Sequence, residues 1–190
     1  TDHGVMYGVI DFYRAAKAAG IRPILITGDQ LATAKAIAKE TGILEDDKKA
    51  LTGAELAMLD DAALAASVED VNVYARVSPG DKLRIVKALQ ARGKVVAMTG
   101  DGVNDLLAMK QADCAIAMAS GAEAASQLAS LVLLDSDFSA MPSVVNEGRR
   151  VINNIQRAAS LFLVKNIFSL FLSIISLFTV MPYPLEPIHL

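Results

Sequence analysis

The chain has 190 residues, of which 53% are hydrophobic and 21% charged, and its 18 basic and 21 acidic side chains give a net charge of −3. This balance argues against binding to nucleic acid, which requires a basic face. The single cysteine, Cys114, rules out an internal disulfide framework and fits a reducing compartment.

Short apolar runs alternate with helical patterns through the first 157 residues. Such alternation is typical of an α/β fold in which helices cover both faces of a parallel sheet. Ligands of these sheets bind beyond the carboxyl ends of the strands, so polar residues at those ends are candidates for a site. The predicted strands are 24–26, 71–75, 94–98, 114–118 and 131–134, and the predicted helices are 5–19, 31–40, 79–91 and 103–111.

Residues 158–181 form a different kind of segment, in which Lys165 is the only charged residue. A helix of this length spans about 36 Å, which exceeds the hydrocarbon core of a bilayer at about 30 Å. The alternative is a buried core helix, but the segment is apolar around its whole circumference. We therefore expect a transmembrane helix.

The charges around this segment predict its orientation. Only Glu186 lies beyond its carboxyl end, whereas Arg149, Arg150, Arg157 and Lys165 flank or enter its amino end. Because basic residues collect on the cytoplasmic side of membranes, we expect the residues before 157 to be cytosolic. Residues 182–190 then form a truncated loop, and the chain is expected to be a fragment of a larger, multi-pass membrane protein.

The sequence GDGVND at 100–105 lies at a predicted strand-to-helix turn. It brings the carboxylates of Asp101 and Asp105 and the amide of Asn104 next to a helix N-terminus. Hard oxygen donors in that setting suit Mg²⁺ and a phosphate group together. The alternative is a turn whose Asp and Asn side chains only cap the helix.

Two further segments offer groups that bind phosphate. The sequence TGD at 27–29 places a hydroxyl and backbone N–H groups at another strand end, and Lys82 lies one turn into the helix 79–91. The alternatives are that Thr27 or Asp29 caps the next helix and that Lys82 is an ordinary surface lysine. A phosphoryl group needs its oxygens held and its charge neutralised, so the combination of these groups predicts phosphoryl chemistry.

Three longer segments resemble one known family. They are ILITGDQLATAKAIAKETGI at 24–43, YARVSPGDKLRIVKALQARGKVVAMTGDGVNDLLAMKQAD at 74–113 and EGRRVINNIQRAASLFLVKNIFS at 147–169. The first resembles the TGD segment of P-type cation-transporting ATPases. The second is similar to that family's hinge and metal-binding signature, and the third to its link into the fifth transmembrane helix.

The resemblance implies a haloacid dehalogenase-like Rossmannoid fold over 24–157 and an ATP-driven cation pump that works through an aspartyl-phosphate intermediate. It implies Mg²⁺ and ATP as cofactors, a transported cation with calcium as the suggested ion, and the bilayer of a bacterial plasma membrane. It assigns phosphate transfer and hydrolysis to Thr27, Gly28, Asp29 and Lys82, nucleotide binding to Arg76, Lys82 and Asn104, and Mg²⁺ binding to Asp101 and Asp105.

The sequence also departs from the family. The DKTGT segment, whose aspartate is the nucleophile, is absent from the 190 residues, and Leu106-Leu107 stands where the family commonly has Ala-Pro. We therefore expect this chain alone to be inactive. The alternatives are a catalytically inactive fragment of the same fold and a soluble phosphatase of the same superfamily, which would need a nucleophilic Asp-x-Asp and no membrane span.

Residues 1–23, TDHGVMYGVIDFYRAAKAAGIRP, resemble a different family, the PHP domain of the bacterial DNA polymerase III alpha subunit. An Asp-His pair such as Asp2-His3 belongs to a metal site in that family, but the chain has no His-x-His partner for it. We therefore expect this segment to contribute a helix rather than a metal site.

Overall fold

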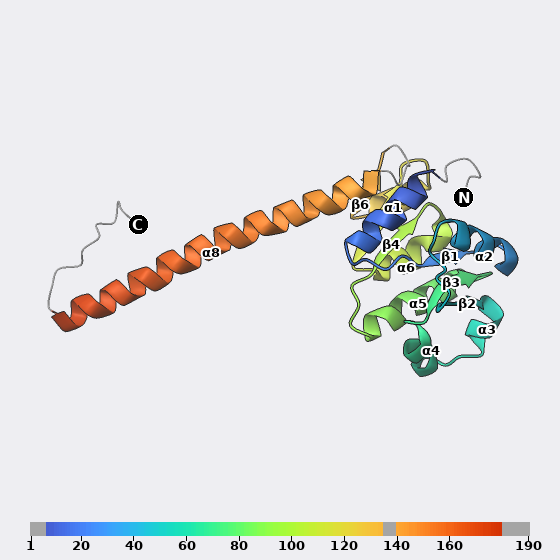
Figure 1. Ribbon diagram of the computed structural model, residues 1–190, viewed down its shortest axis with the longest axis horizontal. Coiled ribbons are helices and arrows are strands. Elements are labelled where there is room, and N and C mark those ends of the chain that lie inside the picture. Colours follow the sequence, from blue (N-terminus) through green and yellow to red (C-terminus); the bar gives the residue numbers. More distant parts are fainter. Residues whose placement is uncertain (1–6, 135–139, 180–190) are drawn as a thin grey trace. The chain divides into compact units, whose positions relative to one another are not determined.

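The computed structural model describes residues 7–134 and 140–179, and the chain divides into two units, residues 1–142 and 143–190. Asp2, His3 and the predicted loop 182–190 lie outside the described residues. In chain order (Figure 1), the elements are α1 (Tyr7–Ala18), β1 (Leu25–Thr27), α2 (Leu31–Glu40), β2 (Lys49–Thr52), α3 (Gly53–Ala57), α4 (Asp61–Ser67), β3 (Val71–Ala75), α5 (Pro79–Ala91), β4 (Ala97–Gly100), the 3₁₀ turn η1 (Val103–Asp105), α6 (Leu106–Gln111), β5 (Cys114–Met118), α7 (Glu123–Leu128), β6 (Leu131–Leu133) and α8 (Met141–Thr179).

The first sheet consists of three parallel strands in the order β1-β3-β2. Its central strand, β3, is buried at all five positions. On one face, Ala34 and Ala38 of α2 and Tyr13 of α1 pack against Val73 and Ala75. The other face is covered by α3, α4 and α5 (Figure 1), and its buried residues are Leu56, Leu64, Val68, Val71, Tyr74, Val77, Ile85, Ala88 and Leu89.

The second sheet is also parallel, with the strand order β4-β5-β6. Helices α5, α6 and α7 pack on one face of this sheet and form with β4 and β5 a buried cluster, which consists of Val86, Met98, Ala108, Met109, Ala115, Ala117 and Ala125. A smaller cluster on the other face contains Ile116, Met118, Leu133 and Met141. Because Ile85 belongs to the core of the first sheet and Val86 to that of the second, α5 ties the two sheets together.

The parallel sheet is therefore in two halves, and β1 and β4 are edge strands among the described residues. Both strands are apolar, yet Leu25 is only half-buried and Ala97 is exposed. Ile26 of β1 and Val96, directly before β4, pack against the same buried cluster. Each of these two edge strands has a TGD sequence at its carboxyl end, at 27–29 for β1 and at 99–101 for β4.

The predicted α/β architecture with parallel strands and helices on both faces is confirmed. The strand prediction for 94–98 was wrong in position, because β4 begins at Ala97 and the preceding residues pair with no strand. The sequence predicted no strand at residues 49–52, which form β2. Strand β2 is an edge strand of four residues whose first residue, Lys49, is exposed.

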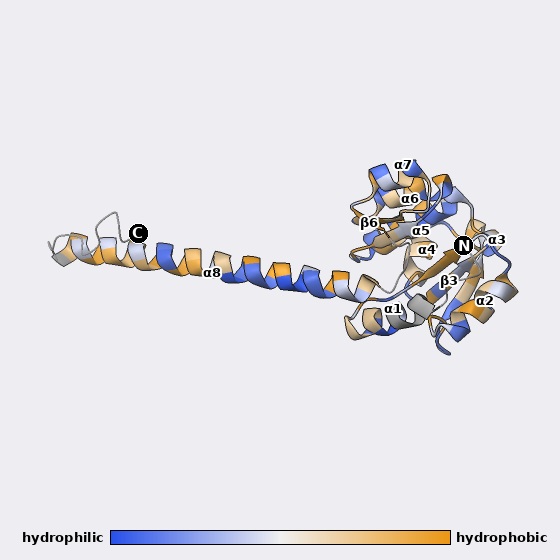
Figure 2. Cartoon of the chain, turned by 90° about the horizontal axis from the view of Figure 1, so that it is seen from above, coloured by the Kyte–Doolittle hydropathy of each residue, from blue (hydrophilic) through white to orange (hydrophobic). Residues whose placement is uncertain are grey.

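Helix α8 starts at Met141 and runs across the boundary between the two units. By length and composition it is able to cross a membrane, since its most apolar stretch has a mean hydropathy of 2.1 and its apolar side chains are exposed. The most hydrophilic residues of α8 gather in its amino-terminal half (Figure 2). The proposed domain limits at 23/24 and 157/158 stay a prediction.

Candidate functional site at the carboxyl edge

The TGD sequence at 27–29 forms a tight turn directly after β1. The Thr27 hydroxyl donates to Oδ2 of Asp29 at 2.9 Å, and the Asp29 backbone N–H donates back to the Thr27 hydroxyl at 3.1 Å. The suggested role as a helix cap is wrong, because the N-cap of α2 is Gln30, which makes no side-chain capping bond. Gly28 and Asp29 are exposed, so their N–H groups and carboxylate lie at the surface of the carboxyl edge.

Arg76 follows β3 at the same edge and is the one non-glycine residue with a positive φ, 53°, among the described residues. An L-residue in this region costs about 1–2 kcal/mol, and such strain persists where neighbouring contacts hold it in place. The Arg76 N–H donates to the Asp29 carbonyl at 3.1 Å. On the other side, a Cβ on Gly53 would lie 2.3 Å from the Arg76 carbonyl oxygen, so only glycine fits there. The Arg76 turn is thereby fixed beside the TGD turn.

Lys82 is positioned by the start of α5. Ser78 and Asp81 form a reciprocal capping box, and Pro79 occupies the first turn of the predicted helix 79–91. The Lys82 ammonium lies 2.5 Å from Oδ1 of Asp105, and the two side chains are only 15% and 9% exposed. The reading of Lys82 as a surface lysine is therefore wrong.

The Lys82–Asp105 ion pair also joins the two halves of the sheet. Lys82 belongs to the helix that follows β3, and Asp105 lies in η1, which follows β4. Groups of opposite charge 23 positions apart in the sequence thus meet where the carboxyl ends of both sheets approach one another. An ammonium largely withdrawn from water is suited to neutralise the charge of an oxyanion.

Two glycines hold the GDGVND turn tightly packed. A Cβ on Gly100 would lie 2.5 Å from Cβ of Asp105, and a Cβ on Gly121 would lie 2.5 Å from the Asp101 carbonyl oxygen. Asp101 is further fixed by the Ala122 N–H, which donates to its carbonyl at 2.7 Å. The sequence did not predict a role for Gly121, because a single glycine after a strand is a common feature of loops.

The alternative of a capping role for the GDGVND side chains is also wrong. The N-cap of η1 is Gly102, and the N-cap of α6 is Asp105, which makes no side-chain capping bond. Asp101 and Asn104 are exposed, whereas Asp105 is buried. The polar side chains of this turn therefore do not cap their own helix. Asp105 contacts Lys82, and Asp101 and Asn104 face solvent.

A metal ion at this edge would find a partly prepared site. Asp101 and Asn104 present hard oxygen donors, and Mg²⁺ favours one or two carboxylates together with phosphate oxygens and water. Asp105, the second predicted ligand, contacts Lys82 instead. Within the described ranges no group of three or more His, Cys, Asp or Glu side chains is arranged to hold a metal ion. The residues present fit a Mg²⁺ ion that is bound jointly with a phosphate.

A family model described as a haloacid dehalogenase-like hydrolase matches residues 2–113. The chain belongs to the haloacid dehalogenase-like hydrolases. The match contains all predicted site residues of both TGD turns, the Arg76 turn and α5. It also begins at residue 2, so the comparison does not separate the segment 1–23 from the rest of this hydrolase fold.

The relatives of this haloacid dehalogenase-like chain include calcium-transporting ATPases. It is 45% identical over 186 residues to calcium-transporting ATPase 1 of Bacillus cereus. This match covers 96% of the chain and 21% of that protein. The chain is 42% identical over 178 residues to the calcium-transporting ATPase of Bacillus subtilis, covering 93% and 20%. Calcium-transporting ATPase type 2C member 2 of Mus musculus is 39% identical over 184 residues, covering 96% and 20%. The chain spans about a fifth of the length of these relatives.

A solved structure supports the same fold. The catalytic domain of the CPx-ATPase CopB-B superimposes on this haloacid dehalogenase-like chain with a TM-score of 0.54 at 25% sequence identity. The match covers 72% of the chain and 44% of the solved chain.

Proposed function

We propose that this chain is part of an ATP-driven cation pump, in which the carboxyl edge binds the phosphoryl group during its transfer and hydrolysis. The observation that supports this most directly is the buried Lys82–Asp105 pair, which brings a cation to the edge where both TGD turns end. The names of the relatives favour calcium as the transported ion.

The proposed roles follow from the placement of each group. The Thr27 hydroxyl and the Gly28 N–H bind phosphoryl oxygens, the Asp29 N–H holds the Thr27 hydroxyl in place, and the Lys82 ammonium neutralises the charge of the phosphoryl oxygens. Arg76 and Asn104, both exposed at this edge, bind the nucleotide. Mg²⁺, held by Asp101 with Asp105 in support, would neutralise charge that develops on the phosphoryl oxygens.

The nucleophile of this reaction must come from outside the 190 residues. The sequence contains no DKTG segment, and a phosphorylated intermediate requires a nucleophilic carboxylate. The open edges of β1 and β4 are consistent with a further parallel strand that pairs with them and delivers an aspartate to the carboxyl edge. We infer that the isolated chain neither forms the intermediate nor hydrolyses ATP.

The second unit has a separate role in this proposal. Residues 158–181 cross the membrane, and the basic residues before them keep the globular part on the cytosolic side. A soluble phosphatase of the same superfamily is less consistent with α8, whose apolar residues are exposed over many turns. The pump proposal accounts for both units in one protein.

A chimaera tests the proposal. The segment of the Bacillus subtilis calcium-transporting ATPase that aligns with this chain is replaced by the 190 residues, so that the relative supplies the nucleophile. We expect an acid-stable phosphoenzyme from γ-labelled ATP and calcium uptake into vesicles, both lost in Lys82→Ala and retained in the matched surface variant Lys87→Ala. A chimaera that inserts into membranes but is labelled equally with and without Lys82 would contradict the proposed site.

A further inference from the structure

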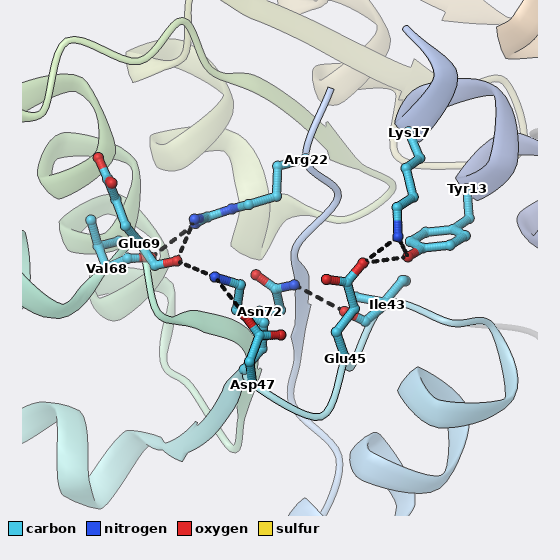
Figure 3. A network of polar contacts seen from close by, with 10 residues as sticks. Tyr13, Lys17, Arg22, Ile43, Glu45, Asp47, Val68, Glu69 and Asn72 are labelled. Atoms are coloured by element: carbon cyan, nitrogen blue, oxygen red, sulfur yellow. Dashed lines mark hydrogen bonds and ion pairs between the residues drawn. The ribbon is translucent and has the colours of Figure 1, made fainter. Parts of the chain in front are cut away.

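A second polar site lies at the opposite, amino-terminal edge of the β1-β3-β2 sheet. It is a cavity of about 220 Å³, far from the TGD turns along the strands, and its polar network is shown in Figure 3. The loop before β1, the loop before β2 and the start of β3 contribute its walls. The lining residues that carry charge or an amide are Lys17, Arg22, Glu45, Lys48 and Asn72.

The carboxylate that faces this cavity is already neutralised. Lys17 donates to Glu45 at 2.6 Å, and the Tyr13 hydroxyl donates to the same carboxylate at 3.1 Å. The hydrogen bond from Lys17 is the main reason why the pKa of Glu45 is lowered. Glu45 is therefore ionised and paired with Lys17. The remaining charged residues that line the cavity are the cations Arg22 and Lys48.

These two cations keep donors to spare. Arg22 uses one N–H of each terminal nitrogen, at 2.6 Å to the Glu69 carbonyl and 2.9 Å to the Val68 carbonyl, out of the five donors of a guanidinium. Lys48 makes only a long contact of 3.5 Å to the Glu69 carbonyl and an ion pair of 3.6 Å with Asp47. Both side chains can therefore donate further hydrogen bonds to an acceptor in the cavity.

Asn72 provides the complementary group. It is only 4% exposed, and its Nδ2 donates to the Ile43 carbonyl at 3.0 Å. Its Oδ1 has no hydrogen-bond partner in the part of the chain that the structure describes. In Figure 3 the Asn72 amide lies between Arg22 and Glu45, and its oxygen is directed away from the Ile43 bond. A buried acceptor without a donor is unfavourable, so this oxygen calls for a ligand that donates a hydrogen.

We propose that this cavity binds a small oxyanion that carries an O–H donor, of which hydrogen phosphate and singly protonated phosphate monoesters are the representatives. Its charged oxygens accept hydrogen bonds from Arg22 and Lys48, and its O–H group donates to Oδ1 of Asn72. A metal cation would be repelled by the cationic side chains, and an oxyanion without a hydrogen would leave the Asn72 acceptor unpaired. The site is independent of the phosphoryl site at the carboxyl edge and does not rest on the proposed pump function.

The test is calorimetric titration of the full chain in detergent micelles, without Mg²⁺ and at slightly acidic pH. The probes are inorganic phosphate, glycerol phosphate as a monoester, and sulfate, which has the shape of phosphate but no O–H group. We expect phosphate to bind more tightly than sulfate by about tenfold, the contribution of one hydrogen bond to a charged group. A glycerol phosphate affinity above that of phosphate assigns the cavity to monoesters, and an equal or lower affinity assigns it to phosphate itself.

Variants test which side chains bind the anion. Lys48→Gln is expected to weaken phosphate binding by about tenfold, and Asn72→Leu to abolish the preference for phosphate over sulfate. Lys87→Gln, a matched exposed lysine, is expected to bind phosphate as the unaltered chain does. Absence of phosphate binding, equal affinity for sulfate, or unchanged binding in Lys48→Gln would overturn the proposal. The sulfate comparison and Lys48→Gln decide it even if Asn72→Leu fails to fold.

Discussion

Lys82 and Asp105 show how one pair of side chains determines both the stability and the chemistry of the carboxyl edge. Both side chains are largely withdrawn from water, and each charge has its counter-charge directly beside it. In the proposed function, the Lys82 ammonium donates to the phosphoryl oxygens, and the ion pair with Asp105 holds it at the carboxyl edge when no phosphoryl group is bound.

Removal of one partner is expected to destabilise the globular unit. Lys82→Ala leaves the Asp105 carboxylate buried without a counter-charge, which should lower the free energy of unfolding by about 3 kcal/mol. Urea titration of the full chain in detergent measures this, with Lys87→Ala as the exposed control, expected within about 0.5 kcal/mol of the unaltered chain. Equal midpoints for the two variants would mean that the ion pair contributes little in solution.

Tyr74 carries a prediction about pH. It is fully buried, its hydroxyl has no hydrogen-bond partner among the described residues, and burial raises its pKa from 10.0 to about 12. Because the folded-state pKa is the higher one, the contribution of Tyr74 to stability is complete below pH 10 and is lost as the pH rises from 10 to about 12. The loss amounts to about 2–3 kcal/mol at most.

Tyr74→Phe is expected to remove this alkaline loss and to stabilise the chain at neutral pH by about 1 kcal/mol, since no hydroxyl remains unpaired. Unfolding curves at neutral pH and at pH values between 10 and 12 check both effects. A destabilised Tyr74→Phe variant at neutral pH would show that the hydroxyl is satisfied by an internal water.

Among the helices and strands, the sequence predicted those whose position depends on the residues of the element itself. The apolar run 71–75 and the helix 79–91, which begins at Pro79, coincide with β3 and α5. The strand β2 and the start of β4 were not predicted, because both depend on which neighbouring strand is available for pairing and not on local apolarity.

The candidate site likewise has features that the sequence predicted and features that it did not predict. That the TGD and GDGVND sequences follow strands was evident from their position after apolar runs. The contact between Lys82 and Asp105 was not, because it depends on α5 packing against both halves of the sheet. The strained turn at Arg76 has no sequence signal of its own, since the glycine that permits it, Gly53, lies 23 positions earlier.

The helix α8 leads to a prediction on its own. The full chain is expected to enter the detergent phase in a phase-separation assay, and a chain that ends at Arg157 to remain in the aqueous phase. A full-length control with Leu170→Asp and Ile174→Asp keeps the length of α8 but interrupts its apolar stretch, at a cost of about 2.5–3.5 kcal/mol for each charge. This control should return to the aqueous phase. Identical partitioning of all three chains would contradict a membrane role for α8.

The molecule as a whole unites the proposed phosphate-binding groups, a pair of buried charges and an apolar helix, and its 190 residues contain no DKTG segment. The isolated chain is expected to release no phosphate from ATP and to give no acid-stable labelled band with γ-labelled ATP. An acid gel of the labelled chain checks this. A band that persists in Asp29→Asn, Asp101→Asn and Asp105→Asn would reveal an acceptor that none of these carboxylates provides.

The two half-sheets have a consequence for handling and for quality control in a cell. The outer sides of β1 and β4 carry rows of backbone N–H and C=O groups without partners among the described residues, and such rows are templates for cross-strand association between molecules. Unless another strand covers them, copies of the chain are expected to join edge to edge and to precipitate as β-rich aggregates. Light scattering of concentrated samples should show this growth, and Ala97→Lys, which places a charge on the exposed position of β4, should slow it. Chaperones are expected to bind the outer sides of β1 and β4 in any copy in which the proposed further strand does not cover them.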